Sequence, residues 1–294
     1  MIVANTRADL NATRDKAGSP VVLVPTMGAL HDGHRALLRR ARELAGAQGT
    51  VVVSIFVNPL QFGPNEDLDS YPRTLDEDLS ACEAEGVDLV FAPSVREMYP
   101  RQQLVGVDPG PTGEILEGEF RPGFFNGVLT VVLKLFSLVR PEVAVFGQKD
   151  AQQLLLVRRM ADDFALGIEI EAVPIVRAAD GLALSSRNKY LSPEERVVAL
   201  ALNRALSAGA AAATEGPAAV LSAARASLAS ATGEHPAEPP SLRVQYVALV
   251  DARSYDFVRD DDLDFRGAAV LAVAAKVGDT RLIDNVLMEF GACC

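Results

Sequence analysis

The sequence predicts an α/β protein: a Rossmann-like, doubly wound parallel sheet followed by a smaller α+β domain. Short runs of β-branched and aromatic residues, typical of strands covered on both faces, alternate with helical patterns from about residue 20 to 176. Beyond that point the order changes to alanine-rich helices and then three strand-like runs. We therefore expect two domains, 1–176 and 177–294.

The elements of the first domain follow from these patterns. Apolar residues at helical spacing, from Leu37 to Ala45, predict a helix over about 34–47. Thr74 followed by Glu77 has the spacing of a capping box and predicts a helix start. Two further helices are predicted over 127–139 and 152–164. The predicted strands are 21–26, 50–59, 87–93, 143–147 and 168–176.

The second domain has its own start signal. Ser192 is the predicted N-cap, and Pro193 lies in the first helical turn. Glu195 completes a capping box with Ser192. Helical sequence continues to about 231 with a break near Gly216, and a polar, proline-rich linker loop is expected over 232–241. The last predicted strands are 242–251, 268–277 and 280–289.

Bulk properties exclude several classes of protein. The formal net charge is −11 and the sequence pI about 4.8, which argues against nucleic acid and anionic membranes as partners but not against a small anionic ligand. No apolar stretch reaches the length of a membrane span, and the charged N-terminus is unlike a signal peptide. Cys82, Cys293 and Cys294 form neither a disulfide framework nor a zinc spacing, so we expect a reducing cytoplasm.

The stretch "PTMGALHDGH" (25–34) follows the first predicted strand and holds two of the three histidines, His31 and His34. A glycine-containing turn into a helix leaves backbone N–H groups free and favours an anion, which both imidazoles could face. The alternatives are a structural pair that caps the helix, and a zinc site, for which further ligands are missing. The position at a strand end, with Gly28 and Gly33, favours the anion.

Three other stretches carry polar groups suited to chemistry. Asn58 and Gln61 open a long polar loop, where an ordinary asparagine–proline turn is the alternative. Lys149 follows a strand and could meet phosphate oxygens, unless it is a surface lysine. "LSSRN" (184–188) offers two hydroxyls and a guanidinium, with a capped turn as the alternative.

The acidic cluster Asp76, Glu77 and Asp78 could help to hold Mg²⁺. We expect instead a solvated first helical turn that complements the helix dipole. No metal ligand is assigned.

"PTMGALHDGH" resembles the signature of the pantoate–β-alanine ligase (pantothenate synthetase) family, a variant of the "HIGH" motif of class I aminoacyl-tRNA synthetases and nucleotidyltransferases. Other stretches resemble that family in the same order and with suitable spacing. They are "SIFVNPLQFGPNEDLDSYPRT" (54–74), "GVLTVVLKLFSLVRP" (127–141), "FGQKDAQQL" (146–154), "DGLALSSRNKYL" (180–191) and "TRLIDN" (280–285).

The resemblance implies an ATP-dependent, AMP-forming ligase with Mg²⁺ that joins pantoate to β-alanine through a pantoyl adenylate, in the biosynthesis of pantothenate and coenzyme A. It implies that domain 1–176 binds nucleotide and pantoate and that domain 177–294 is a lid. It also implies a cytoplasmic homodimer.

Site residues are implied in the same way. His34 and His31 stabilise charge on the α-phosphate, although His34 is usually described in this family as a proton donor, and Lys149 completes the catalytic set. Gln61 is implied to bind both pantoate and β-alanine, Gln153 to bind pantoate, and Asn58 to bind substrate. The implied ATP-binding residues are Met27, Gly28, Ala29, Leu30, His31, Asp32, Gly33, His34, Gly147, Gln148, Lys149, Asp150, Val176, Leu184, Ser185, Ser186 and Arg187.

Two positions depart from the family pattern. Gln148 stands where the family usually has Glu, and Phe124 where it usually has His. Two rival functions are a nucleotidyltransferase of another specificity and a nucleotide-binding regulatory protein that has lost turnover. Gln61 and Gln153 argue against another specificity. The intact histidines, the lysine and "SSR" argue against a protein that has lost turnover.

Overall fold

The computed structural model describes residues 1–64, 66–232, 241–262 and 264–291. Nearly all of the predicted linker, as well as Cys293 and Cys294, lies outside these ranges. The chain forms two compact units. The first unit comprises Met1–Gln148 and Gln152–Pro174, and the second comprises Lys149–Ala151 and Ile175–Cys294.

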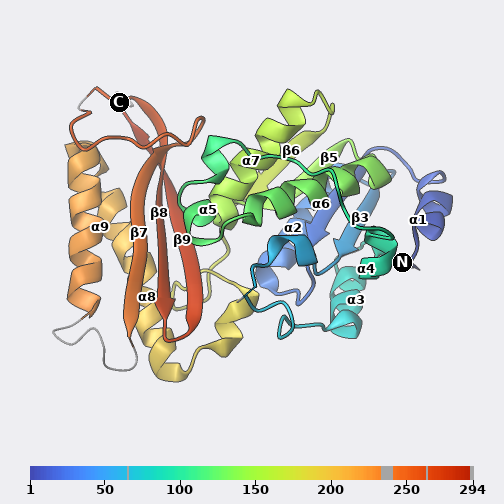
Figure 1. The fold of residues 1–294 in the computed structure, drawn as a ribbon, viewed down its shortest axis with the longest axis horizontal. Helices are drawn as coiled ribbons and strands as arrows, with labels where there is room; N and C mark the ends of the chain where they lie inside the picture. Colours follow the sequence, from blue (N-terminus) through green and yellow to red (C-terminus); the bar gives the residue numbers. More distant parts are fainter. Residues whose placement is uncertain (65, 233–240, 263, 292–294) are drawn as a thin grey trace. The chain divides into compact units, whose positions relative to one another are not determined.

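The first unit is built on a parallel sheet of strand order β1-β4-β3-β2-β5-β6 (Figure 1), which confirms the predicted α/β fold. Every strand pairing in it is parallel. The strands are β1 (Ile2–Ala4), β2 (Val21–Thr26), β3 (Thr50–Ile55), β4 (Leu89–Phe91), β5 (Val143–Gly147) and β6 (Glu169–Val173).

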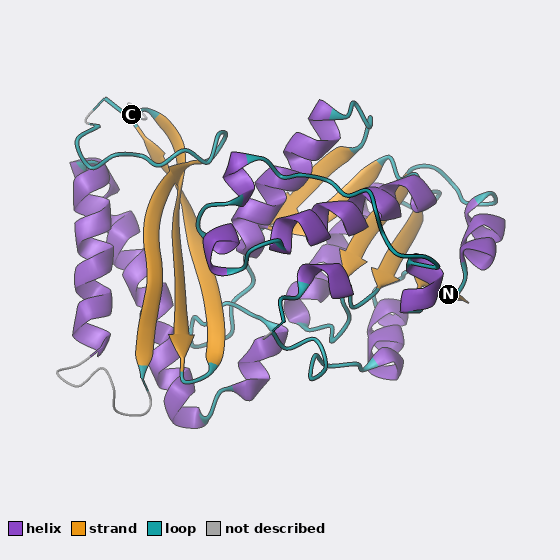
Figure 2. Ribbon diagram, in the orientation of Figure 1, coloured by secondary structure: helices purple, strands orange, loops and turns teal. Residues whose placement is uncertain are grey.

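Helices cover both faces of this sheet (Figure 2). Alternate residues of β2 point to opposite faces, so Val22 and Val24 pack with helix α2 while Leu23 packs with helix α6. Burying each such side chain contributes about 1.5–3 kcal/mol. The α-helices of this unit are α1 (Arg7–Arg14), α2 (Asp32–Ala45), α3 (Leu75–Ala84), α4 (Val95–Met98), α5 (Glu117–Phe120), α6 (Phe124–Val139) and α7 (Ala151–Asp163).

Two elements at the N-terminus were not predicted. Strand β1 is apolar but has only three residues, and of these only Ala4 is buried. Helix α1 buries only Leu10. Elements this short and exposed leave little hydrophobic periodicity in the sequence.

The strand order reverses at β2. The chain moves from β2 to β3 on one side, and β5 later pairs with β2 on the other side. In open parallel sheets, ligands bind beyond the carboxyl ends of the strands at such a switch point. The stretch after Thr26 and the residues Gly147 and Gln148 occupy this place.

The second unit has an antiparallel sheet of order β7-β8-β9. Its strands are β7 (Leu242–Asp251), β8 (Gly267–Val277) and β9 (Thr280–Phe290), and helices α8 (Pro193–Ala211) and α9 (Pro217–Thr232) share a core with them. The three predicted strands and the break near Gly216 are confirmed. The capping box of Ser192 and Glu195 is confirmed as well.

The other predicted capping box is wrong. Thr74 precedes α3 but makes no capping hydrogen bond, because its backbone (φ −124°, ψ 49°) departs from the extended conformation usual at an N-cap. Its hydroxyl lies 3.4 Å from Oδ2 of Asp78 instead.

Candidate active site

The two histidines lie where strand β2 gives way to helix α2, in a segment (26–34) that we call the histidine turn. His31 is the N-cap of α2, and its Nδ1 accepts the N–H of Gly33 at 3.1 Å. Nδ1 of His34 accepts the N–H of His31 at 3.3 Å. The two side chains thus form a reciprocal capping box, with ring centroids 4.1 Å apart. The helix-capping alternative is therefore part of the observed geometry.

This cap also determines the tautomer of both rings. An imidazole nitrogen that accepts a hydrogen bond carries no proton. Neutral His31 and His34 therefore hold their proton on Nε2, and each ring has an N–H donor on the side opposite the cap. Capping and anion recognition use different nitrogens, so the two interpretations are compatible.

The expectation of free backbone N–H groups is wrong for five residues of this turn, Gly28, Ala29, Leu30, His31 and Gly33. Ala29 and Leu30 donate their N–H groups to the carboxylate of Asp78 at 3.0 and 2.7 Å, and Gly28 donates to Oγ1 of Thr26 at 3.2 Å. The N–H groups of His31 and Gly33 are used by the histidine cap. The groups of this turn suited to an anion are therefore the imidazole Nε2–H donors rather than these amides.

Asp78 corrects a second expectation. Asp76 and Glu77 are exposed, as predicted, but Asp78 is only 2% exposed. Its carboxylate reaches from α3 to a turn in which Gly28 and Ala29 have positive φ angles of 81° and 51°. A Cβ at Gly28 would lie 2.8 Å from Oδ2 of Asp78, so glycine permits both the backbone angle and the close approach.

Asn58 is buried, and its side chain bonds to the protein in four directions. Its Nδ2 donates to Oε1 of Gln61 at 3.0 Å and to the carbonyl of Gly127 at 3.1 Å. Its Oδ1 accepts the N–H of Leu60 at 3.3 Å and the hydroxyl of Tyr99 at 2.9 Å. Burial raises the pKa of Tyr99 to about 12, so this hydroxyl remains a donor. The amide of Asn58 thus orients Gln61.

Gln61 joins the histidine turn to the long polar loop. Its Nε2 lies 3.3 Å from Sδ of Met27, and its carbonyl accepts from Arg121 at 3.3 Å. Arg121 also forms a two-point ion pair with Glu66 (2.7 and 2.6 Å) and stacks on Phe124, 3.6 Å from the ring centroid. The structure therefore brings Met27, Asn58 and Gln61 together.

The two adjacent glutamines in α7 have different surroundings. Gln152 is buried; its Oε1 accepts the N–H of Glu117, and its Nε2 donates to the carbonyls of Thr112 and Ile115. Gln153 is half-buried. Gln152 thus has a structural partner in the loop before α5, and Gln153 remains the candidate for pantoate.

The predicted phosphate-binding residues that follow Gln148 belong to the second unit. The side chain of Lys149 is 22% exposed, and its Nζ lies 3.8 Å from Oδ1 of Asp150. Residues 176–184 form a small hairpin, which we call the arginine hairpin: the N–H of Leu184 donates to the carbonyl of Val176, and Arg177 pairs with Ala183.

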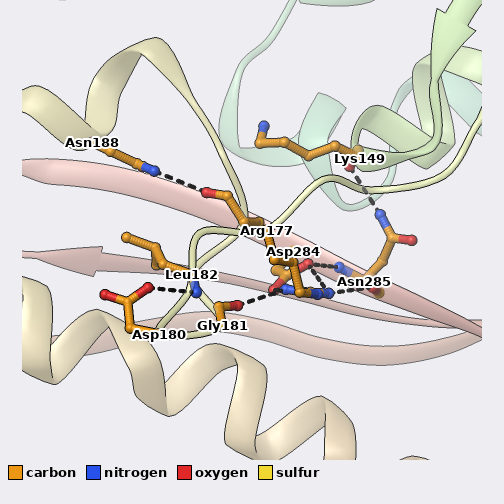
Figure 3. Close-up of polar contacts among 9 residues, drawn as sticks. Lys149, Arg177, Asp180, Gly181, Leu182, Asn188, Asp284 and Asn285 are labelled. Carbon is orange, nitrogen blue, oxygen red and sulfur yellow. Dashed lines mark hydrogen bonds and ion pairs between the residues drawn. The ribbon is translucent and has the colours of Figure 1, made fainter. Parts of the chain in front are cut away.

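The hairpin leads directly into the serine-rich stretch. Ser185 caps the short helical turn Ser186–Tyr190, its Oγ accepting the N–H of Arg187 at 3.3 Å. Nδ2 of Asn188 donates back to the carbonyl of Ala183 at 2.9 Å (Figure 3). The structure therefore joins Val176, Leu184 and 185–187 into one folded segment.

The profile of the Pantoate-beta-alanine ligase family matches residues 2–287. The chain belongs to this family. It is 61% identical over 291 residues to the pantothenate synthetase of Thermobifida fusca, covering 97% of this chain and 95% of that protein. It is 54% identical to the enzyme of the same name from Acidothermus cellulolyticus, with 98% and 92% covered.

Solved structures of the family have the same fold. Pantothenate synthetase from Thermus thermophilus superposes with a TM-score of 0.87 at 45% identity, covering 97% of this chain and 99% of that one. A pantoate–β-alanine ligase from Francisella tularensis, described as a complex with β-γ ATP and β-alanine, gives 0.76 at 32% identity, with 98% and 97% covered.

The departures from the pattern of the pantoate–β-alanine ligase family lie in identifiable places. Phe124 is the first residue of α6 and supplies the ring on which Arg121 stacks. Gln148 begins the short turn after β5. Phe124 therefore supports the arginine that holds the loop of Gln61.

Sequence reasoning missed the polar residues that hold the site residues in place. The sequence pattern indicates a solvated Asp78 and gives no sign of a role for Arg177. Asp284 and Asn285 stood only inside the family stretch "TRLIDN". The available signal is Asp284 itself, which interrupts the apolar alternation of Leu282, Val286, Met288 and Phe290.

Within the described ranges, no helix combines the length and apolar character needed to cross a membrane. In the same part of the chain, no three His, Cys, Asp or Glu side chains gather into a metal site.

Proposed function

We propose that this chain condenses pantoate with β-alanine to pantothenate and converts ATP to AMP and diphosphate. The observation that carries the proposal is the histidine turn. In a chain of this family, two imidazoles fixed in one tautomer lie at the switch point of the sheet. The Francisella tularensis relative, whose described complex contains β-γ ATP and β-alanine, supports the same substrates.

The reaction divides into two steps. An oxygen of the pantoate carboxylate attacks the α-phosphorus of ATP, the bond to diphosphate breaks, and pantoyl adenylate forms. The amine of β-alanine then attacks the acyl carbon, the acyl–phosphate bond breaks, and the amine loses a proton as AMP leaves. Because a carboxylate is a poor electrophile, adenylation supplies the leaving group.

The residues of this chain contribute mainly position and charge stabilisation. The Nε2–H donors of His31 and His34 are assigned to the α-phosphate as its negative charge is redistributed. Gln61, oriented by Asn58, and Gln153 are assigned to the substrates. Asn58 acts on the substrate through Gln61, since its own polar atoms are engaged by the protein.

The remaining phosphate contacts are assigned to Lys149 and to 185–187. A lysine supplies a point charge, and arginine and serine supply directed donors. We further assign domain 177–294 the role of a lid that keeps water from the adenylate. A smaller radius of gyration with ATP bound would support this role, and an unchanged value would contradict it.

We propose that Mg²⁺ enters with ATP and neutralises phosphate charge. The acidic cluster does not fit the ion as a protein site, because both oxygens of Asp78 accept backbone N–H groups and Asp76 and Glu77 are exposed. No protein ligand is therefore assigned to the metal.

We also propose a cytoplasmic homodimer, as the family resemblance implies. Cys82 is a free, buried thiol, and burial raises its pKa to about 12, so it remains protonated and suits a reducing compartment. Light scattering of the purified protein tests the dimer: twice the chain mass of 31.3 kDa supports it, and a single chain mass contradicts it.

The test of function is a reconstituted reaction. Purified protein is mixed with ATP, Mg²⁺, pantoate and β-alanine, and AMP and pantothenate are followed together, with His34→Ala as the control. Equal amounts of AMP and pantothenate, lost in the control, are expected. AMP formed only with other acids or amines would indicate a different specificity. ATP binding without turnover would identify a regulatory protein, with Gln148 and Phe124 as the first positions to revert.

A further inference from the structure

Strand β9 carries two adjacent buried polar residues, Asp284 and Asn285, which are 4% and 7% exposed. Neighbouring residues in a strand face opposite sides, and β9 is an edge strand of its sheet. Asp284 shares the face of Leu282 and Met288, which pack in the helix-covered core. Buried polar groups need partners, so the partners show what these residues hold.

Asp284 holds the arginine hairpin. Its carboxylate receives Nη1 and Nη2 of Arg177 at 2.6 and 3.0 Å, a two-point ion pair. Nη1 of Arg177 also donates to the carbonyl of Gly181 at 3.2 Å (Figure 3). One guanidinium thus connects the strand to the tip of a hairpin whose ends are Val176 and Leu184.

Asn285 holds a different segment. Its Nδ2 donates to the carbonyl of Lys149 at 2.9 Å, as Figure 3 shows, across 136 residues of sequence. Its own N–H donates to Oδ1 of Asp284 at 2.8 Å. The two polar residues are therefore hydrogen-bonded to each other while each restrains a separate segment.

We propose that Asp284 and Asn285 are positioning residues that fix the spacing between Lys149 and the serine-rich stretch 185–187. The inference rests on the proposed function, which assigns both segments to the phosphates of ATP. Donors bind a triphosphate together only when they are held at the spacing of its oxygens, and a displacement of about 1 Å can reduce activity by about a hundredfold. The ion pair of Asp284 with Arg177 and the hydrogen bond of Asn285 to Lys149 start from the same strand, so they set the spacing of the two segments.

The first test is Asn285→Leu, which keeps the approximate size of the side chain and removes the donor to Lys149. We expect the Kd and the KM for ATP to rise by about tenfold while the KM for β-alanine is unchanged. Asn285→Thr suits a strand and is the second variant should the leucine protein not fold. It should show the same selective effect, because its hydroxyl is too short to replace the amide.

The matched control is Gln245→Leu. Oε1 of Gln245 accepts Nε of Arg281 at 2.7 Å, so this change removes a hydrogen bond to β9 at a residue on the same face as Asn285. It should leave the Kd for ATP unchanged. Thermal unfolding and the fraction of folded protein are measured for each variant, because a merely structural role would change these and not the ATP constants of the folded protein.

The outcomes separate the two claims. If wild-type protein binds ATP but makes no pantothenate, the proposed function fails, and the positioning role is judged from the ratio of Kd values alone. If wild-type protein is active and the folded Asn285 variants keep its Kd and KM for ATP, the positioning role is overturned. If wild-type protein does not bind ATP, both claims fail.

Discussion

The histidine turn of the first unit and the arginine hairpin of the second are each held by one buried aspartate from a distant part of the chain. Asp78 is 2% exposed and Asp284 is 4% exposed. Asp78 accepts main-chain N–H groups, whereas Asp284 accepts the side chain of Arg177. The first restraint is therefore independent of the side chains in the turn, and the second depends on a single arginine.

In both regions, the residue that holds the segment in place is therefore different from the residues assigned to ATP. In the histidine turn, the carboxylate holds the main chain of Ala29 and Leu30, so this restraint remains when the capping imidazoles of His31 and His34 are changed. In the arginine hairpin, Arg177 is not assigned to ATP; it connects the tip of the hairpin at Gly181 to Asp284 in β9. A substitution there should displace the neighbouring phosphate ligands without removing any of them.

The largest effect on kcat is expected from a substitution that removes the Nε2–H donor of His31 and keeps the cap of α2. Asparagine is among the best N-cap residues, so His31→Asn should keep α2 capped while removing the Nε2–H donor. We expect kcat to fall about 100- to 1,000-fold, the usual loss for one charge-stabilising donor. The free energy of unfolding should change by no more than about 0.5 kcal/mol.

Steady-state AMP formation and urea unfolding of the same preparation check this expectation. Unchanged kcat in His31→Asn would show that the imidazole serves only as a cap. His31→Ala, which removes cap and donor together, should lose both activity and stability.

The next largest effect is expected from Asp78→Ala. It leaves the N–H groups of half-buried Ala29 and Leu30 without their partner, at about 1–2 kcal/mol each, the lower part of the range for a buried group. The free energy of unfolding should fall by about 2–4 kcal/mol, and kcat by about tenfold to a hundredfold as the histidines lose their position.

Exposed Glu77, on the same helical turn, offers the matched control: Glu77→Ala should stay within about 0.5 kcal/mol of wild type in urea unfolding. If Asp78→Ala were as stable and active as this control, the aspartate would not be what holds the turn.

A smaller effect is expected from Arg177→Lys. The lysine keeps a positive charge beside buried Asp284 but lacks the planar fork that makes the two-point contact. The KM for ATP should rise by about fivefold with kcat within a factor of about three, because the neighbouring phosphate ligands shift but remain present. A larger change in the KM for pantoate than for ATP would contradict the connection from the hairpin to the phosphates.

The smallest effect concerns pH and the tip of the hairpin. The hydrogen bond from Arg196, then that from the N–H of Leu182, holds the pKa of Asp180 below its ordinary 3.8. A carboxyl whose pKa is lowered by folding stabilises the protein above its unfolded pKa and loses this contribution as the pH falls through the folded pKa.

Wild-type protein should therefore lose slightly more stability than Asp180→Asn between about pH 5 and the acid range below about pH 4. Thermal unfolding midpoints of the two proteins across this range provide the measurement. Parallel curves would mean that the exposed ion pair of Asp180 and Arg196 has no stabilising effect.

The chain contains two sequences with the spacing of a capping box, and only one of them forms the box. Ser192 and Glu195 form the box, since Ser192 has the extended backbone usual at an N-cap and a proline follows it in the first turn. Thr74 and Glu77 have the same spacing, yet the hydroxyl of Thr74 lies nearest the carboxylate of Asp78, which is held by the histidine turn. In the second case the backbone of Thr74 departs from the N-cap conformation, and its hydroxyl contacts a carboxylate that a distant segment holds in place.

The sequence by itself determined the alternation of strands and helices, the separate character of the last three strands, and the histidine pair at the end of β2. These features depend on neighbours in the chain, on hydrophobic runs and on residue chemistry. Only the tertiary structure decided that Asp78 holds Ala29 across 49 residues and that Asp284 holds Arg177 across 107. Such pairs leave no local periodicity, because folding alone brings a buried carboxylate to its donors.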